Sequence, residues 1–84
     1  MEIHQLESFL SVIETGSFRA AAEQLHKAQS AVSFAVKSLE DQLGFKLFDR
    51  SEYRPKLTLQ GKHFLPHVKN FLQEQRSLEE YGKF

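Results

Sequence analysis

The fold is indicated by residues 17–48, SFRAAAEQLHKAQSAVSFAVKSLEDQLGFKLF, which contain two apolar periods separated by a short polar turn. In each period, apolar side chains recur every three or four positions, as they do on one face of a helix. The first set is Phe18, Ala21, Ala22 and Leu25. The second set is Val32, Val36, Leu39 and Leu43. The stretch therefore predicts two short amphipathic helices.

The turn between these predicted helices consists of residues 26–28 alone. So short a connection makes the helices cross instead of continuing in one line. Gly44 is placed to end the second helix in a left-handed cap. Two such helices form a helix-turn-helix, and in DNA-binding proteins the second helix of the pair enters the major groove.

Three further elements are expected around this pair. A first helix over residues 4–15 stops at Gly16, and Ser17 can cap the next helix. Residues 46–50 and 56–59 have alternating apolar residues on either side of a polar turn. They predict a small β-hairpin, or wing.

A last helix is predicted from a cap at Thr58 to about Tyr81. Its apolar seam has heptad-like spacing and consists of Phe64, Val68, Phe71 and Leu78. A helix with its own seam has more apolar surface than a small domain can cover, so we expect a homodimer. The predicted fold is mainly α: a winged helix-turn-helix domain at residues 1–58, with a linker and dimerisation helix at residues 59–84.

Charge is distributed unevenly along the chain. The formal net charge is zero, but residues 17–62 hold eight Lys or Arg against five Asp or Glu, a surplus of three positive charges. Residues 1–16 carry three Glu and no Lys or Arg. The basic excess thus lies on the helix-turn-helix and the wing, where phosphates would be contacted.

Several classes of protein are not expected. The 84 residues contain no cysteine, which suits a reducing cytoplasm, and no apolar run approaches a membrane span. There is no nucleophile elbow, phosphate loop or paired-carboxylate motif, so neither an enzyme nor a cofactor is expected. His63 and His67 have the spacing of two metal ligands, but no third ligand stands nearby on that face, and no metal site is expected.

Three segments carry a family resemblance: residues 6–26 (LESFLSVIETGSFRAAAEQLH), residues 29–50 (QSAVSFAVKSLEDQLGFKLFDR) and residues 57–61 (LTLQG). In this order and register the chain resembles the amino-terminal domain of LysR-type bacterial transcription regulators. The resemblance implies sequence-specific binding of double-stranded DNA and a role in transcription. It also implies a separate domain after the linker helix that binds a small-molecule effector, and the chain is expected to be the DNA-binding fragment.

Three positions depart from the family pattern. Ala28 stands where a capping serine is frequent, and Ser30 stands where proline is frequent, so Ser30 is expected to take over part of the capping. Phe34 stands where many members have an arginine. Base readout at that position therefore cannot be copied from the family.

A helical projection of the second helix places Ser30, Phe34 and Lys37 near the side opposite its apolar face, with Gln29 and Ser33 flanking them. Gln29 can pair with adenine, and the two serines can bond to bases or phosphates. Phe34 can press on a thymine methyl group, or it can fold back onto Arg19 or the turn. These side chains are the candidates for base contact.

Cations near these positions are candidates for phosphate contact, which neutralises charge without reading sequence. They are Arg19, Lys27, Lys37, Arg50, Arg54 and Lys56. Arg54, at the wing tip, could instead enter a minor groove narrowed by A·T pairs, or the wing could simply be a solvated loop. We expect the partner to be an AT-rich inverted repeat. The alternative is a helical module that dimerises or recruits a protein without reading DNA.

Overall fold

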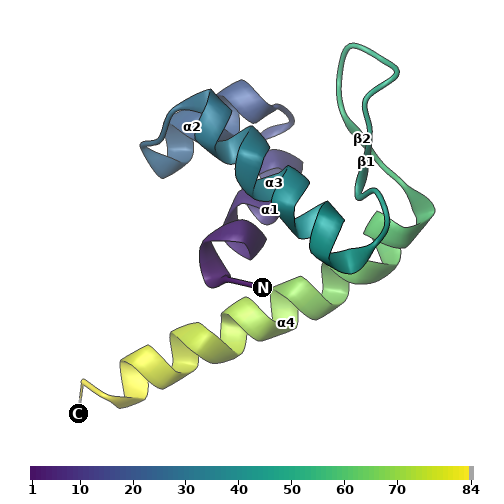
Figure 1. The fold of residues 1–84 in the computed structure, drawn as a ribbon. Helices are drawn as coiled ribbons and strands as arrows, with labels where there is room; N and C mark the ends of the chain where they lie inside the picture. Colours follow the sequence, from purple (N-terminus) through teal and green to yellow (C-terminus); the bar gives the residue numbers. More distant parts are fainter. Residues whose placement is uncertain (84) are drawn as a thin grey trace.

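The computed structural model describes residues 1–83, so Phe84, the last residue of the predicted linker segment, lies outside the described range. The elements follow one another as α1 (Ile3–Thr15), α2 (Phe18–Leu25), α3 (Gln29–Leu43), β1 (Phe48–Asp49), β2 (Lys56–Leu57) and α4 (Leu59–Tyr81). This order confirms the predicted winged helix-turn-helix and long last helix (Figure 1).

The helix ends have local causes in the sequence. Ser17 accepts a hydrogen bond from the Ala20 N–H at 3.0 Å and caps α2. Gly44 ends α3 with φ of 82°, a left-handed conformation that costs glycine little. The start of α3 differs from expectation, because no side chain caps it and Ser30 does not take over that role.

The core forms around α1, which contacts α2, α3 and α4. Phe9 of α1 is fully buried between Phe48 of β1 and Phe64 of α4, with ring centroids 5.5 and 5.7 Å apart. Phe18 of α2 meets Phe48 edge-on at 5.7 Å. Tilted and edge-on aromatic pairs of this kind each add about 0.5–1.5 kcal/mol beyond their buried area.

The wing is shorter than predicted. β1 and β2 pair antiparallel over two residues each, with Phe48 opposite Leu57 and Asp49 opposite Lys56. The second strand ends early because Thr58 caps α4 and Leu59 is already helical. The Ser51 N–H donates to Asp49 at 3.0 Å, and this hydrogen bond lowers the pKa of the Asp49 carboxyl.

The apolar seam predicted for the last helix must be corrected. Val68 is buried against the chain's own core together with Leu72, and Phe64 packs on Phe9 and on Phe45. These side chains hold α4 to the domain as far as Leu72, and Gln75 and Arg76 still line a hollow together with residues of α1 and α2. The last turns of α4 continue past the core toward the carboxyl end (Figure 1).

Candidate nucleic-acid interface

The recognition face is the side of α3 that turns away from the core. Val32, Val36 and Leu39 are fully buried on the inner side. On the outer side the predicted candidates Gln29, Ser30, Phe34 and Lys37 are exposed, and Ser33 is half-buried. The structure therefore gathers all five predicted side chains on the outer part of α3. The wing extends beside this helix, and its tip lies on the side of the domain away from α4 (Figure 1).

Phe34 does not fold back onto the protein. Its side chain is 72% exposed, a high value for a large apolar residue. Arg19, its suggested cover, instead lies 3.7 Å from the carboxylate of Glu23 one turn away in α2. Of the two alternatives for Phe34, only the outward one matches this conformation.

A hollow between the wing and the amino-terminal ends of α2 and α3 brings three predicted residues together. Arg19, Gln29 and Arg54 line it, along with Ser17 and the fully exposed Tyr53. The Arg54 guanidinium lies above Gly16, so this arginine turns toward the helix-turn-helix. An anion in this hollow would meet two guanidinium groups and the amide of Gln29.

Arg50, directly after β1, has contacts that the sequence did not predict. Its guanidinium stands 4.5 Å from the centre of the Phe18 ring and 3.8 Å from Glu40. A second hollow beside it is lined by Lys37 and Lys46 as well. Arg50 therefore helps to hold α2, α3 and the wing together, in addition to presenting a charge to solvent.

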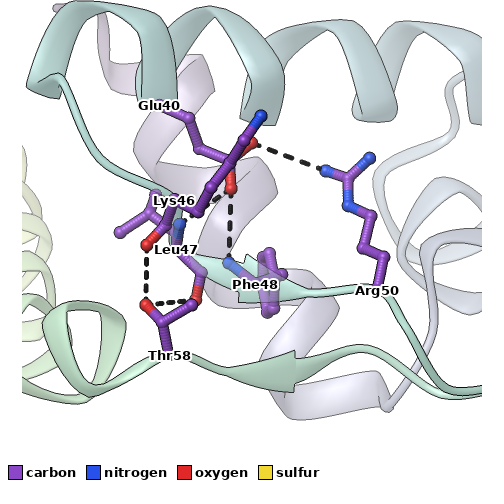
Figure 2. A network of polar contacts seen from close by, with 6 residues as sticks. All are labelled: Glu40, Lys46, Leu47, Phe48, Arg50 and Thr58. Carbon is purple, nitrogen blue, oxygen red and sulfur yellow. Dashed lines mark hydrogen bonds and ion pairs between the residues drawn. The ribbon is translucent and has the colours of Figure 1, made fainter.

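Glu40 connects the recognition helix to the wing (Figure 2). Its buried carboxylate accepts hydrogen bonds from the backbone N–H groups of Leu47 at 2.7 Å and Phe48 at 3.2 Å. Each of these buried N–H groups would be costly to leave without a partner. These hydrogen bonds tie α3 to the first strand of the wing.

Thr58 continues this network to α4 (Figure 2). Its hydroxyl donates to the carbonyl of Lys46 at 2.6 Å and accepts from the Gly61 N–H at 3.0 Å. Gly61 lies so close to the Leu47 carbonyl that a Cβ atom would overlap it. The wing is therefore anchored at its base by α3 and α4, while its tip is open to solvent.

The remaining predicted cations are also at the surface. Lys56 pairs with Glu52 across the wing at 3.0 Å, and Lys27 is exposed in the turn between α2 and α3. Sequence reasoning missed Ala31, which is exposed on α3, and the wing-tip Tyr53. The helical projection could have found Ala31, but nothing in the local sequence distinguishes Tyr53.

The histidine pair and the dimerisation residues lie on α4. His63 and His67 are exposed, and residues 1–83 contain no group of three His, Cys, Asp or Glu able to hold a metal ion. Of the four predicted dimerisation residues, Phe71 is 49% exposed and Leu78 is 71% exposed. Within the same range, no helix has the length and apolarity needed to cross a membrane.

Comparison with known proteins agrees with this geometry. Residues 3–62 match the lysR family of bacterial regulatory helix-turn-helix proteins. The "Probable nitrogen assimilation transcriptional activator" of Synechococcus elongatus is 46% identical over 74 residues, which make up 88% of this chain and 24% of that protein. The chain thus spans about a quarter of the length of this relative.

Solved structures with the same fold include two bound to DNA. The BenM_DBD complex with catB site 1 DNA has a TM-score of 0.94 and 31% identity, covering 99% of this chain and 93% of that one. The CbnR_DBD–DNA complex has a TM-score of 0.91 and 32% identity, covering 99% and 95% of the two chains.

Proposed function

The chain belongs to the LysR family of bacterial regulatory helix-turn-helix proteins. We propose that it binds double-stranded DNA and is the DNA-binding part of a transcription regulator. In this proposal α3 enters the major groove, and the wing meets the neighbouring backbone. One observation supports it above all others: Gln29 at the start of α3 and the wing cation Arg54 line one hollow, and the wing tip lies on the side of the domain away from α4. The similarity to two domains solved with DNA supports DNA as the partner.

Base contact is proposed for the outer face of α3. Gln29 has an amide that can bond to both exposed groups of an adenine edge, and the hydroxyls of Ser30 and Ser33 can reach bases or phosphates. Their exposure on one side of α3 supports this assignment. Phe34 belongs to the same face, and its role is taken up below.

Phosphate contact is proposed for the six cations at the surface of the helix-turn-helix and the wing. They are Arg19, Lys27, Lys37, Arg50, Arg54 and Lys56. Each phosphate that they neutralise releases a counterion, so affinity should fall steeply as salt rises. The turn of Arg54 toward Gly16 favours a phosphate near the start of α2 over direct entry into a narrow minor groove.

We further propose that two copies pair through α4. Phe71, Leu78 and Tyr81 are exposed side chains in the carboxyl-terminal part of this helix that the chain's own core leaves uncovered. Of the earlier candidates, Val68 can contribute only indirectly, by holding α4 in place, and Phe64 is partly covered. A two-fold dimer would present two recognition helices to an inverted repeat, which we expect to be AT-rich.

The whole protein is proposed to act in the cytoplasm without catalysis, with a small-molecule effector bound outside this domain. This part of the proposal rests on membership of the LysR family alone, and the chain covers about a quarter of the length of its relative from Synechococcus elongatus.

Binding isotherms at several salt concentrations test the proposal. Duplexes recovered by selection from random DNA should bind more tightly than random duplex, and the logarithm of the association constant should fall linearly with the logarithm of salt concentration. Selected sites should contain an inverted repeat with half-site centres about one helical turn, or a multiple of it, apart. Dimerisation without salt-dependent binding to any duplex would instead favour the protein-interaction module.

A further inference from the structure

We infer that α3 reads the C5-methyl groups of pyrimidines through an apolar strip formed by Ala31 and Phe34, so that 5-methylcytosine can replace thymine at the position read. The inference rests on the proposed function, because it assigns a class of base to the face that enters the major groove. Both side chains are exposed. They are three residues apart on one helix and are therefore surface neighbours.

The surroundings of this strip show which partner it fits. Ser30 and Lys37 flank Phe34 and are exposed, while Gln29 and Arg54 line the hollow toward the wing. A protein partner that covered Phe34 would also have to pair these polar and cationic groups. A DNA groove presents phosphates to the cations and has isolated apolar spots within a polar edge.

The only apolar group that an unmodified base pair presents in the major groove is the C5-methyl of thymine. Phe34 has no donor or acceptor, so it cannot bond to the N7 and O6 atoms of guanine as an arginine there would. Ala31 and Phe34 stand about 4.5 Å apart along the helix axis. This is close to the roughly 3.4 Å between successive base pairs, so both residues can contact methyl groups of neighbouring pyrimidines.

Cytosine methylated at C5 carries the same methyl group at the same ring position as thymine. An apolar contact does not distinguish the two methyl groups. The affinity of this domain for a site with cytosine at the position read should therefore rise when that cytosine is methylated.

The test uses duplexes selected from random DNA with the unmodified chain. In one set of duplexes, each thymine is replaced singly by uracil. In two further sets, the same thymine is replaced by cytosine or by 5-methylcytosine, with guanine opposite in both. At one or two positions in each half-site, uracil should weaken binding about fourfold, the effect of losing one buried methyl group. At those positions 5-methylcytosine should bind about fourfold more tightly than cytosine.

Variants connect this effect to the strip. Phe34→Ala should abolish both ratios at the position that Phe34 contacts and leave the salt dependence unchanged, whereas Phe34→Leu should retain part of both ratios there. Asp41→Ala, an exposed change two turns farther along the same side of α3, should retain both in full. Circular dichroism checks that each variant is folded. If Phe34→Ala does not fold, the ratios measured for the unmodified chain and for Phe34→Leu test the inference.

Three outcomes would overturn the inference or its premise. If the chain binds the selected duplexes preferentially, but uracil binds as well as thymine and cytosine as well as 5-methylcytosine at every position, methyl groups are not read. The proposed function would then stand. Unchanged ratios in Phe34→Ala would assign the methyl contact to another residue. No preference of the unmodified chain for any duplex would contradict the proposed function itself.

Discussion

The two longest helices, α3 and α4, differ in what they leave exposed. α3 has 15 residues and is covered on its inner side by α1 and α2, and Phe34 is its one large apolar residue that is exposed. α4 has 23 residues, of which Gly61, Val68 and Leu72 are buried. Its exposed large apolar residues are Leu59, Phe71, Leu78 and Tyr81.

This difference indicates two kinds of partner. A polar face with nearby cations suits a polyanion, whereas repeated exposed apolar side chains are stabilised only when another apolar surface covers them. α4 can keep such a surface because its last turns extend beyond the core. In the proposed function, DNA contact and self-association use different helices of one small domain.

The largest expected effect concerns α4. Phe71→Lys combined with Leu78→Lys should give a folded monomer, because two charges replace the exposed apolar contacts. Its affinity for a duplex with both half-sites should fall about 10²–10⁴-fold, the usual gain from linking two binding events. Sedimentation and binding isotherms measure both changes.

The matched control is Gln73→Lys combined with Ser77→Lys, two exposed positions on the opposite side of the same helix. This variant should remain dimeric with little change in affinity. A dimeric Phe71→Lys, Leu78→Lys variant would mean that α4 does not carry the interface.

Glu40→Ala should have the next largest effect, on stability. The substitution leaves the buried N–H groups of Leu47 and Phe48 without their acceptor, and should lower the free energy of unfolding by about 2–4 kcal/mol. Chemical denaturation measures the loss. Asp41→Ala, the exposed neighbour, should change stability by less than about 0.5 kcal/mol. Equal effects of the two substitutions would show that the link between α3 and the wing contributes little.

Gln29→Ala tests the recognition face. Losing a bidentate contact to adenine should cost about 1–3 kcal/mol on the selected site and relax the preference at one base pair in each half-site. Binding to random duplex should hardly change. Competition experiments with single-base variants of the site measure the preference, and an equal loss on selected and random duplexes would assign Gln29 to phosphate contact.

Lys37→Ala should have the smallest effect. It should weaken binding to selected and random duplexes alike and reduce the salt slope by about one for each half-site. Lys37 is a better choice than Arg50, because removing Arg50 also removes contacts to Glu40 and Phe18. A salt slope identical to that of the unmodified chain would exclude a phosphate contact by Lys37.

Local patterns in the sequence were sufficient to predict the order of the helices and strands and most of the residues at which they begin and end. The apolar periods of α2 and α3 and the caps at Ser17 and Thr58 are short-range features, since each depends on residues within a few positions. The same helical period places Phe34 on the outer side of α3, although it left open whether the ring folds back onto the protein. These features were predictable because they require no knowledge of what a helix packs against.

The roles of Glu40, Arg50 and Val68 could be found only from the tertiary packing. A heptad-like spacing places Val68 and Phe71 on the same broad side of α4, but α1 and the rest of the core cover Val68 and leave Phe71 half exposed. Glu40 is likewise one acid among many in the sequence, and becomes a link to the wing because the chain returns past it at Leu47. Periodicity determines which side chains share a face, whereas contacts between segments distant in sequence determine which part of that face is buried.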